Sequence, residues 1–139
     1  MKTGEIDRAF VAAKDAIKCL HLYDKYLFVG GCDPVIRAYD LTSGQMKTFE
    51  GHRSWVLCIN TLQITKKDGG VADWLFSSSD DNTIRIWDLK TGACLEELIG
   101  HTNGVLTMAF ANNSLFTGSY DHCMIMWDLN EIEQKIYEN

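Results

Sequence analysis

The chain has 139 residues, of which 46% are hydrophobic and 23% are charged, and its formal net charge is −6. This length is enough for one domain with a buried core, and the composition is typical of a soluble globular protein. The acidic balance argues against nucleic-acid binding by this chain, because its only adjacent basic pair is Lys66-Lys67.

The sequence also disfavours a membrane protein, a secreted protein and a metal-binding protein. No apolar run approaches the ~20 residues that span a bilayer, and residues 1–10 lack the apolar segment of a secretory signal. The five cysteines form no CxxC pair, so we predict no metal site and no cofactor. We expect reduced, mostly buried thiols in a cytoplasmic or nuclear protein, with a disulfide or a reactive thiol as the alternative.

The first predicted element is a strand over residues 5–12, and a unit of short strands follows it over residues 16–50. This unit contains "LFVGGCDPVIRAYDL" at 27–41 and ends in the glycine turn "TSGQ". Pro34 is suited to a tight turn, because its φ is fixed. The expected core of this unit consists of Leu20, Leu22, Leu27, Phe28, Val35 and Ile36.

The second unit, residues 51–99, begins with Gly51-His52 and contains four β-rich stretches separated by turn signals. It is longer than the third unit, because His52 to Trp87 spans 35 residues whereas His101 to Trp127 spans 26. The additional residues fall in "QITKKDGGVAD" at 63–73, which we predict to be a loop. Two interpretations are open: a tolerated surface insertion and a partner-binding loop.

The third unit, residues 100–139, begins with Gly100-His101 and repeats the pattern as "LFTGSYDHCMIMWDL" at 115–129. Residues 123–127 are apolar at every position, so we expect a strand that is covered on both faces. The final segment, 130–139, is predicted to be either a fourth strand or a short helix.

The Gly-His, Trp-Asp and glycine-turn elements recur together at a period near 40 residues. In this the chain resembles the WD40-repeat family, whose members form β-propellers of four-stranded antiparallel blades. The resemblance implies an all-β fold with about three blades of an incomplete ring. Residues 1–12 would be the last strand of a preceding blade, 16–50 a degenerate blade, 51–99 a blade, and 100–139 a blade without a clear fourth strand.

Propellers typically have four to eight blades, so two explanations are open. The chain is an excerpt or short isoform of a longer propeller, or several copies join head to tail into an oligomeric ring. In both cases the terminal blades expose apolar faces, and we expect self-association or completion of a larger propeller.

The resemblance implies a structural tetrad of His, Ser or Thr, Asp and Trp in each blade. The first unit departs from it, because Gly31 takes the place of the serine and Tyr39 that of the tryptophan, while Asp33 is kept. The two complete tetrads are expected at His52, Ser79, Asp81 and Trp87, and at His101, Ser119, Asp121 and Trp127.

Ser, His and Asp are also the components of a hydrolase triad. Here the same set occurs twice, each time with a tryptophan at the same offset, and no G-x-S-x-G turn surrounds either serine. We therefore predict a repeated structural network and no catalytic residues.

The family resemblance implies a scaffold that binds partner proteins or peptides through loops of one propeller face. The candidate partner-binding residues are Arg53, Trp55, Asp80, Asn103 and Tyr120. For three of them a structural explanation is also open: Trp55 packs between blades, and Arg53 and Asp80 are solvated charges.

A second functional hypothesis is that the chain is the propeller module of an RNA-associated zinc finger protein, with RNA binding elsewhere or on this chain.

Overall fold

The computed structural model describes residues 4–6 and 9–137, which form antiparallel strands and one helix. In chain order the elements are β1 (Ile17–Tyr23), β2 (Tyr26–Gly31), β3 (Asp33–Asp40), β4 (Met46–Phe49), β5 (Val56–Thr65), β6 (Val71–Ser79), β7 (Thr83–Asp88), β8 (Cys94–Ile99), β9 (Val105–Ala111), β10 (Ser114–Ser119), β11 (Met124–Asp128) and α1 (Leu129–Tyr137). They build three sheets with the strand orders β1-β2-β3-β4, β5-β6-β7-β8 and β11-β10-β9.

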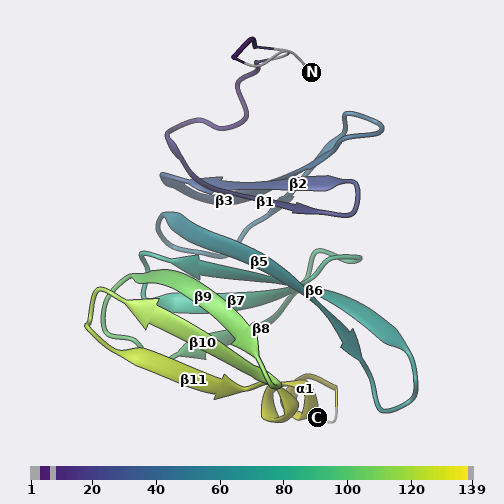
Figure 1. Cartoon of the computed structure of the whole chain (residues 1–139), viewed down its shortest axis with the longest axis vertical. Coiled ribbons are helices and arrows are strands. Elements are labelled where there is room, and N and C mark those ends of the chain that lie inside the picture. Colours follow the sequence, from purple (N-terminus) through teal and green to yellow (C-terminus); the bar gives the residue numbers. More distant parts are fainter. Residues whose placement is uncertain (1–3, 7–8, 138–139) are drawn as a thin grey trace.

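The three sheets stack face to face in chain order, with the β5–β8 sheet in the middle (Figure 1). The middle sheet is covered on both sides, so consecutive residues of one strand are both buried. In β6, for example, Leu75 contributes to the core shared with the first sheet, and Phe76 to the core shared with the third. The core between the first two sheets consists of Phe28, Ile36, Ala38, Phe49, Val56, Ile59, Leu75, Trp87 and Leu89.

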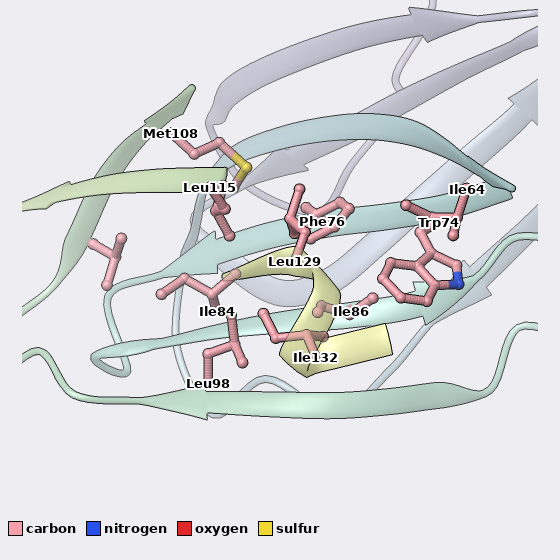
Figure 2. Packing of buried hydrophobic residues seen from close by; sticks show 11 residues of the cluster. Ile64, Trp74, Phe76, Ile84, Ile86, Leu98, Met108, Leu115, Leu129 and Ile132 are labelled. Atoms are coloured by element: carbon pink, nitrogen blue, oxygen red, sulfur yellow. The ribbon is translucent and has the colours of Figure 1, made fainter. Parts of the chain in front are cut away.

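The core between the second and third sheets also includes side chains of α1. Leu129 and Ile132 of the helix point into the space beside Trp74 and Ile86 (Figure 2). Within the described residues, no helix is long and apolar enough to cross a bilayer.

The expected loop over residues 63–73 is instead an extension of a β-hairpin. Gln63 pairs with Asp73 and Thr65 with Val71, so β5 and β6 continue almost to the turn. The turn is closed by the Lys66 N–H, which donates to the Gly70 carbonyl at 2.7 Å. The two glycines of this segment therefore mark a tight turn between paired strands.

The segment after β11 is a helix and not a fourth strand. Asp128 caps its N-terminus, since one carboxylate oxygen accepts the N–H groups of Asn130 at 2.9 Å and Glu131 at 3.3 Å. Leu129 and Ile132 are both buried on one side of the helix. The third sheet consequently has three strands, and β11 lies at its edge.

Two expectations about burial in the outer sheets are wrong. Met124 and Met126 of β11 are 72% and 65% exposed, because no further sheet covers their side of the third sheet. Leu20 and Leu22 of β1 are exposed on the opposite end of the stack, although Phe28 and Ile36 of the same sheet are fully buried. The stack of three sheets therefore presents exposed apolar side chains on the outer face of both its first and its third sheet.

The strand expected over residues 1–12 falls partly on residues 1–3 and 7–8, which lie outside the described ranges. Residues 4–6 and 9–12 contain no strand. This segment lies against the outer face of the first sheet, where the Tyr39 hydroxyl donates to the Ala12 carbonyl at 2.6 Å and the Phe10 ring meets the Tyr39 ring edge-on.

Candidate functional site

A hydrogen-bonded network lies inside the middle sheet and joins the loop before β5 to β6, β7 and the turn between them. His52 Nδ1 lies 2.9 Å from Asp81 Oδ2, and His52 Nε2 lies 2.6 Å from Ser77 Oγ. The Trp87 indole N–H donates to the same Ser77 oxygen at 2.8 Å. The serine of this tetrad is therefore Ser77, and the expectation of Ser79 is wrong.

The third sheet contains the same network with a threonine. His101 Nδ1 lies 2.8 Å from Asp121 Oδ2, and His101 Nε2 lies 2.8 Å from Thr117 Oγ1. The Trp127 indole N–H donates to Thr117 Oγ1 at 2.9 Å. Thr117 thus takes the position that we expected for Ser119.

Strand pairing explains the displacement by two residues. Leu75 pairs with Trp87, so the next side chain on that face of β6 is Ser77, directly beside the indole. Ser79 lies at the end of the strand, where its hydroxyl donates to the Trp55 carbonyl at 2.7 Å and accepts the Asp81 N–H at 3.1 Å. Ser79 therefore shapes the turn and does not join the network.

The order of donors in the network follows from the indole, which can only donate. Because Trp87 donates to the Ser77 oxygen, the serine O–H is free to donate to His52 Nε2. The remaining ring proton then lies on Nδ1 and is donated to Asp81. With this single arrangement of protons, each hydrogen bond between Trp87, Ser77, His52 and Asp81 has one donor and one acceptor.

The two aspartates of the networks are held ionised. Burial alone would raise the pKa of Asp81, but hydrogen bonds from His52, Thr83 and the Arg53 N–H outweigh it and hold the pKa well below its ordinary value. For Asp121, hydrogen bonds from His101 and the N–H groups of Cys123 and Thr102 outweigh desolvation and lower the pKa to about 2.

The connectivity Asp81–His52–Ser77 is that of a hydrolase triad, but the surroundings are not those of an active site. Ser77 is fully buried, and so is the His52 side chain. The buried serine oxygen also accepts a hydrogen bond from the Trp87 indole N–H, so it is both inaccessible to a substrate and engaged within the sheet. The same arrangement recurs in the third sheet, as expected for a structural element.

The first sheet lacks the network. Val29 stands at the strand position of Ser77, so the expected equivalence of Gly31 with the serine is wrong by the same two residues. Asp33 has no histidine partner and instead accepts two hydrogen bonds from Arg37 Nη1, at 3.2 and 2.9 Å.

The candidate partner-binding residues lie in the loops and turns at one end of the second and third sheets, next to the two networks. We call this end of the sheets the Gly-His end, and it is formed by residues 51–55, 80–82, 100–104 and 120–122. Trp55 and Tyr120 are 46% and 55% exposed here. The Lys18 ammonium, which the sequence did not indicate, lies 5.6 Å from the centre of the Trp55 ring.

The other three candidates differ in their surroundings. Asp80 is exposed, and Ser54 Oγ lies 3.5 Å from its carboxylate. Asn103 is also exposed and accepts the Gly104 N–H at 2.7 Å. Arg53 turns away toward β8, where it forms an ion pair of 2.8 Å with Glu97.

Comparisons with known proteins agree with this geometry. A family model described as WD domain, G-beta repeat matches residues 43–88 and 92–128. An uncharacterised WD repeat-containing protein of Schizosaccharomyces pombe is 36% identical over 107 residues, covering 75% of this chain and 28% of the relative. The ribosome biogenesis protein YTM1 of Kluyveromyces lactis is 23% identical over 138 residues, covering 90% of this chain and 29% of that protein.

A solved structure, that of U3-55K, superposes with a TM-score of 0.72 at 25% identity and covers 89% of this chain. These likenesses confirm the expected all-β fold of antiparallel blades in a partial propeller. The chain spans 39% of the U3-55K chain and less than a third of either relative.

Proposed function

Because the chain belongs to the WD40-repeat family, we propose that it is a non-catalytic scaffold that binds partner proteins or peptides through the Gly-His end. WD40 domains are typically protein-interaction scaffolds and generally have no catalytic activity. The observation that supports this surface is the exposure of two aromatic side chains, Trp55 and Tyr120, on backbone that hydrogen bonds to neighbouring turn residues hold in place.

The backbone near both aromatic residues is fixed by hydrogen bonds. The Trp55 carbonyl accepts the Ser79 hydroxyl and the Asp80 N–H, and the Tyr120 N–H donates to the Gly104 carbonyl at 3.0 Å. Exposed aromatic side chains on ordered backbone bind with little loss of conformational freedom, and they are enriched in binding hot spots.

Cross-linking of the chain to its cellular partners tests this surface. We expect Trp55→Ala combined with Tyr120→Ala to reduce recovery of the partners at least about fivefold, since hot-spot truncations cost more than about 1 kcal/mol. Val71→Ala is the control, because Val71 is an exposed apolar residue of the β5–β6 hairpin. Unchanged recovery with the double variant would place the binding surface elsewhere.

The second candidate function, in an RNA-associated zinc finger protein, has weaker support. YTM1 is named for ribosome biogenesis, but none of the relatives above is described as a zinc finger protein. The net charge of −6 and the pairing of Arg53 with Glu97 disfavour phosphate binding. Salt-sensitive retention of RNA by this chain in a filter assay would support it.

We also infer that a further blade covers the open faces of the outer sheets, from a second copy or from a longer propeller. Ile84 and Ile86 of β7 are fully buried under the third sheet, whereas Met124 and Met126 occupy the equivalent positions of β11 and are exposed. A cytoplasmic or nuclear location remains our proposal from the odd number and the spacing of the cysteines. The expectation that the thiols are mostly buried is wrong, because three of the cysteines are half-buried and two are exposed.

A further inference from the structure

Asn103-Gly104 is the single Asn-Gly pair of the chain, and it lies in the loop before β9 at the Gly-His end. We propose that Asn103 is a site of spontaneous deamidation, and that the acid formed there weakens partner binding at this end. The reaction itself is independent of the proposed function, whereas its effect on partner binding rests on that function.

The reacting atoms already lie close together. The Gly104 N–H donates to the Asn103 side-chain oxygen Oδ1 at 2.7 Å. Because a C=O bond is about 1.23 Å long, the Gly104 nitrogen lies no more than about 3.9 Å from Asn103 Cγ. An intramolecular reaction is fastest when the fold holds its reacting atoms near contact distance.

The reaction needs only the chain and water. The Gly104 nitrogen loses its proton and attacks Asn103 Cγ, and the new N–C bond closes a five-membered succinimide ring. The side-chain nitrogen leaves as ammonia, which takes up a proton in place of the one that Gly104 lost. Water reaches the exposed side chain and opens the ring at either carbonyl, which yields aspartate or isoaspartate at position 103.

The glycine distinguishes this asparagine from one in a similar hydrogen bond. In β5 the Thr61 N–H donates to Asn60 Oδ1 at 2.9 Å. Asn60 and Thr61 are both paired with β6, and threonine is branched at Cβ, so the backbone between them is held extended. Ring closure requires rotation of this backbone. Gly104 precedes β9 and has no side chain, so rotation is easier there.

Either product changes the loop beside the exposed ring of Tyr120. The Tyr120 N–H donates to the Gly104 carbonyl at 3.0 Å, and the Ser119 hydroxyl donates to the Asn103 carbonyl at 3.1 Å. Isoaspartate lengthens the backbone by one carbon atom and converts the acceptor of Ser119 into a side-chain carboxylate. Aspartate adds a negative charge beside Gly104, which the Asp80 carboxylate also borders. We therefore expect partners that contact Tyr120 to bind less well.

Peptide mapping by mass spectrometry tests the reaction in the folded 139-residue chain, incubated at neutral pH in H₂¹⁸O. We expect an amide-to-acid conversion at Asn103 with incorporation of one ¹⁸O, and both aspartate and isoaspartate as products. Conversion should be at least about tenfold faster at Asn103 than at Asn60, which shares the hydrogen bond but not the glycine.

Two variants of the pair act on different atoms. Gly104→Ala should slow conversion at least about tenfold, because a Cβ hinders rotation of the backbone and approach of the nitrogen. Its φ lies outside the left-handed region, and the nearest atom to the new Cβ is the movable Asp80 Oδ1 at 2.7 Å. Asn103→Gln leaves the backbone unchanged and should abolish conversion at position 103, because its ring would have six members. Gly70→Ala, in the β5–β6 hairpin, is the control and should convert as the parent chain does.

Three results would overturn the reaction: no conversion at Asn103, equal rates at Asn103 and Asn60, or parental rates in Gly104→Ala. A synthetic peptide of residues 99–107 gives the rate without the fold. Conversion roughly 100-fold slower in the folded chain than in this peptide would show that the loop protects Asn103.

The effect on binding is measured by cross-linking fresh and converted chain to cellular partners. Converted chain should recover the partners at least about twofold less well, and ageing should cause no such loss in Asn103→Gln. Equal recovery by fresh and converted chain would overturn the effect on binding but not the reaction. The proposed function fails separately, when cross-linked partners survive the loss of Trp55 and Tyr120.

Discussion

Among single residues, the two networks provide hydrogen-bond partners for buried polar atoms whose burial would otherwise destabilise the fold, and they fix the positions of the side chains that they join. Ser77 accepts from Trp87 and donates to His52, and its neighbour Ser78 is equally buried but has no hydrogen-bond partner among the described residues. The two serines differ by one position in β6 and point to opposite faces, so they provide a direct comparison of a used and an unused hydroxyl.

Ser77→Ala should lower the free energy of unfolding by about 1–3 kcal/mol, because it leaves the Trp87 indole and His52 Nε2 without partners. Ser78→Ala should be neutral or stabilising, since its hydroxyl is buried and unpaired. Urea unfolding followed by tryptophan fluorescence measures both. Equal effects of the two substitutions would contradict the assignment of Ser77 to the tetrad.

The lowered pKa of Asp121 predicts acid sensitivity. Its pKa is about 2 in the folded chain and 3.8 ordinarily, so the folded state holds fewer protons on this group. The resulting stabilisation is complete above about pH 5 and is lost as the pH falls through 3.8 toward 2. Asp81 acts in the same direction.

Urea unfolding at pH 7, 4 and 3 checks this prediction with Asp121→Asn. The variant should be less stable than the parent chain at pH 7, and the difference should shrink between pH 4 and 3. Asp68→Asn, in the hairpin turn, serves as the control and should keep the parent's pH dependence. If the difference in stability between Asp121→Asn and the parent chain does not change with pH, the ionised carboxylate of Asp121 is not the source of the stabilisation.

Among the elements, two features depart from the repeat, the extended β5–β6 hairpin and the helix α1, and they contact each other. The extended β5–β6 hairpin and α1 lie side by side at the end of the sheets opposite the Gly-His end, where the Trp74 indole N–H donates to the Tyr137 hydroxyl at 3.0 Å. The Lys66 ammonium lies 4.9 Å from the centre of the Tyr137 ring. The hairpin thus contacts the helix of the same chain.

Tyr137→Phe should therefore lower the free energy of unfolding by about 1 kcal/mol, because the buried Trp74 N–H loses its acceptor. Lys135→Ala is the control on the same helix. It removes an ion pair with Glu96 at 3.2 Å, but the lysine is largely exposed, and such pairs contribute about 0.5 kcal/mol or less. A larger effect of Lys135→Ala would show that the helix is held by charge and not by Tyr137.

At the scale of the whole molecule, both ends of the stack present apolar faces that resemble its interior interfaces. Met124 and Met126 lie on one end, and Leu20 and Leu22 on the other. Because the two faces differ, contact between copies would be head to tail, and such contacts continue until a ring closes or a filament grows.

We expect the 139-residue chain to associate at tens of micromolar in light scattering or sedimentation velocity. Met124→Glu combined with Met126→Glu should shift the population toward monomer, since charge on an apolar contact face opposes association. Val71→Glu, on the hairpin, should not. A monomeric parent chain at these concentrations would contradict association through the open faces.

Much of the fold could be predicted from the sequence. Repeated Gly-His, Trp-Asp and turn elements indicate stacked antiparallel blades, and the same pattern predicts that His52, Asp81 and Trp87 belong to a structural network. These features depend on local turn chemistry and on a period that recurs along the chain. The site is predicted less completely, because the contact of Lys18 with the Trp55 ring arises only where neighbouring sheets meet.

The repeat, the alternation of strands and the residue types of the networks follow from the sequence alone, since each depends on local spacing. The hydroxyl that joins each network depends on the fold, because the pairing of β6 with β7 places Ser77 beside Trp87. The helix over residues 129–137 likewise depends on tertiary contacts, since Leu129 and Ile132 pack into the core that contains Trp74. Both features depend on contacts between residues that are distant in the sequence, so local sequence patterns do not specify them.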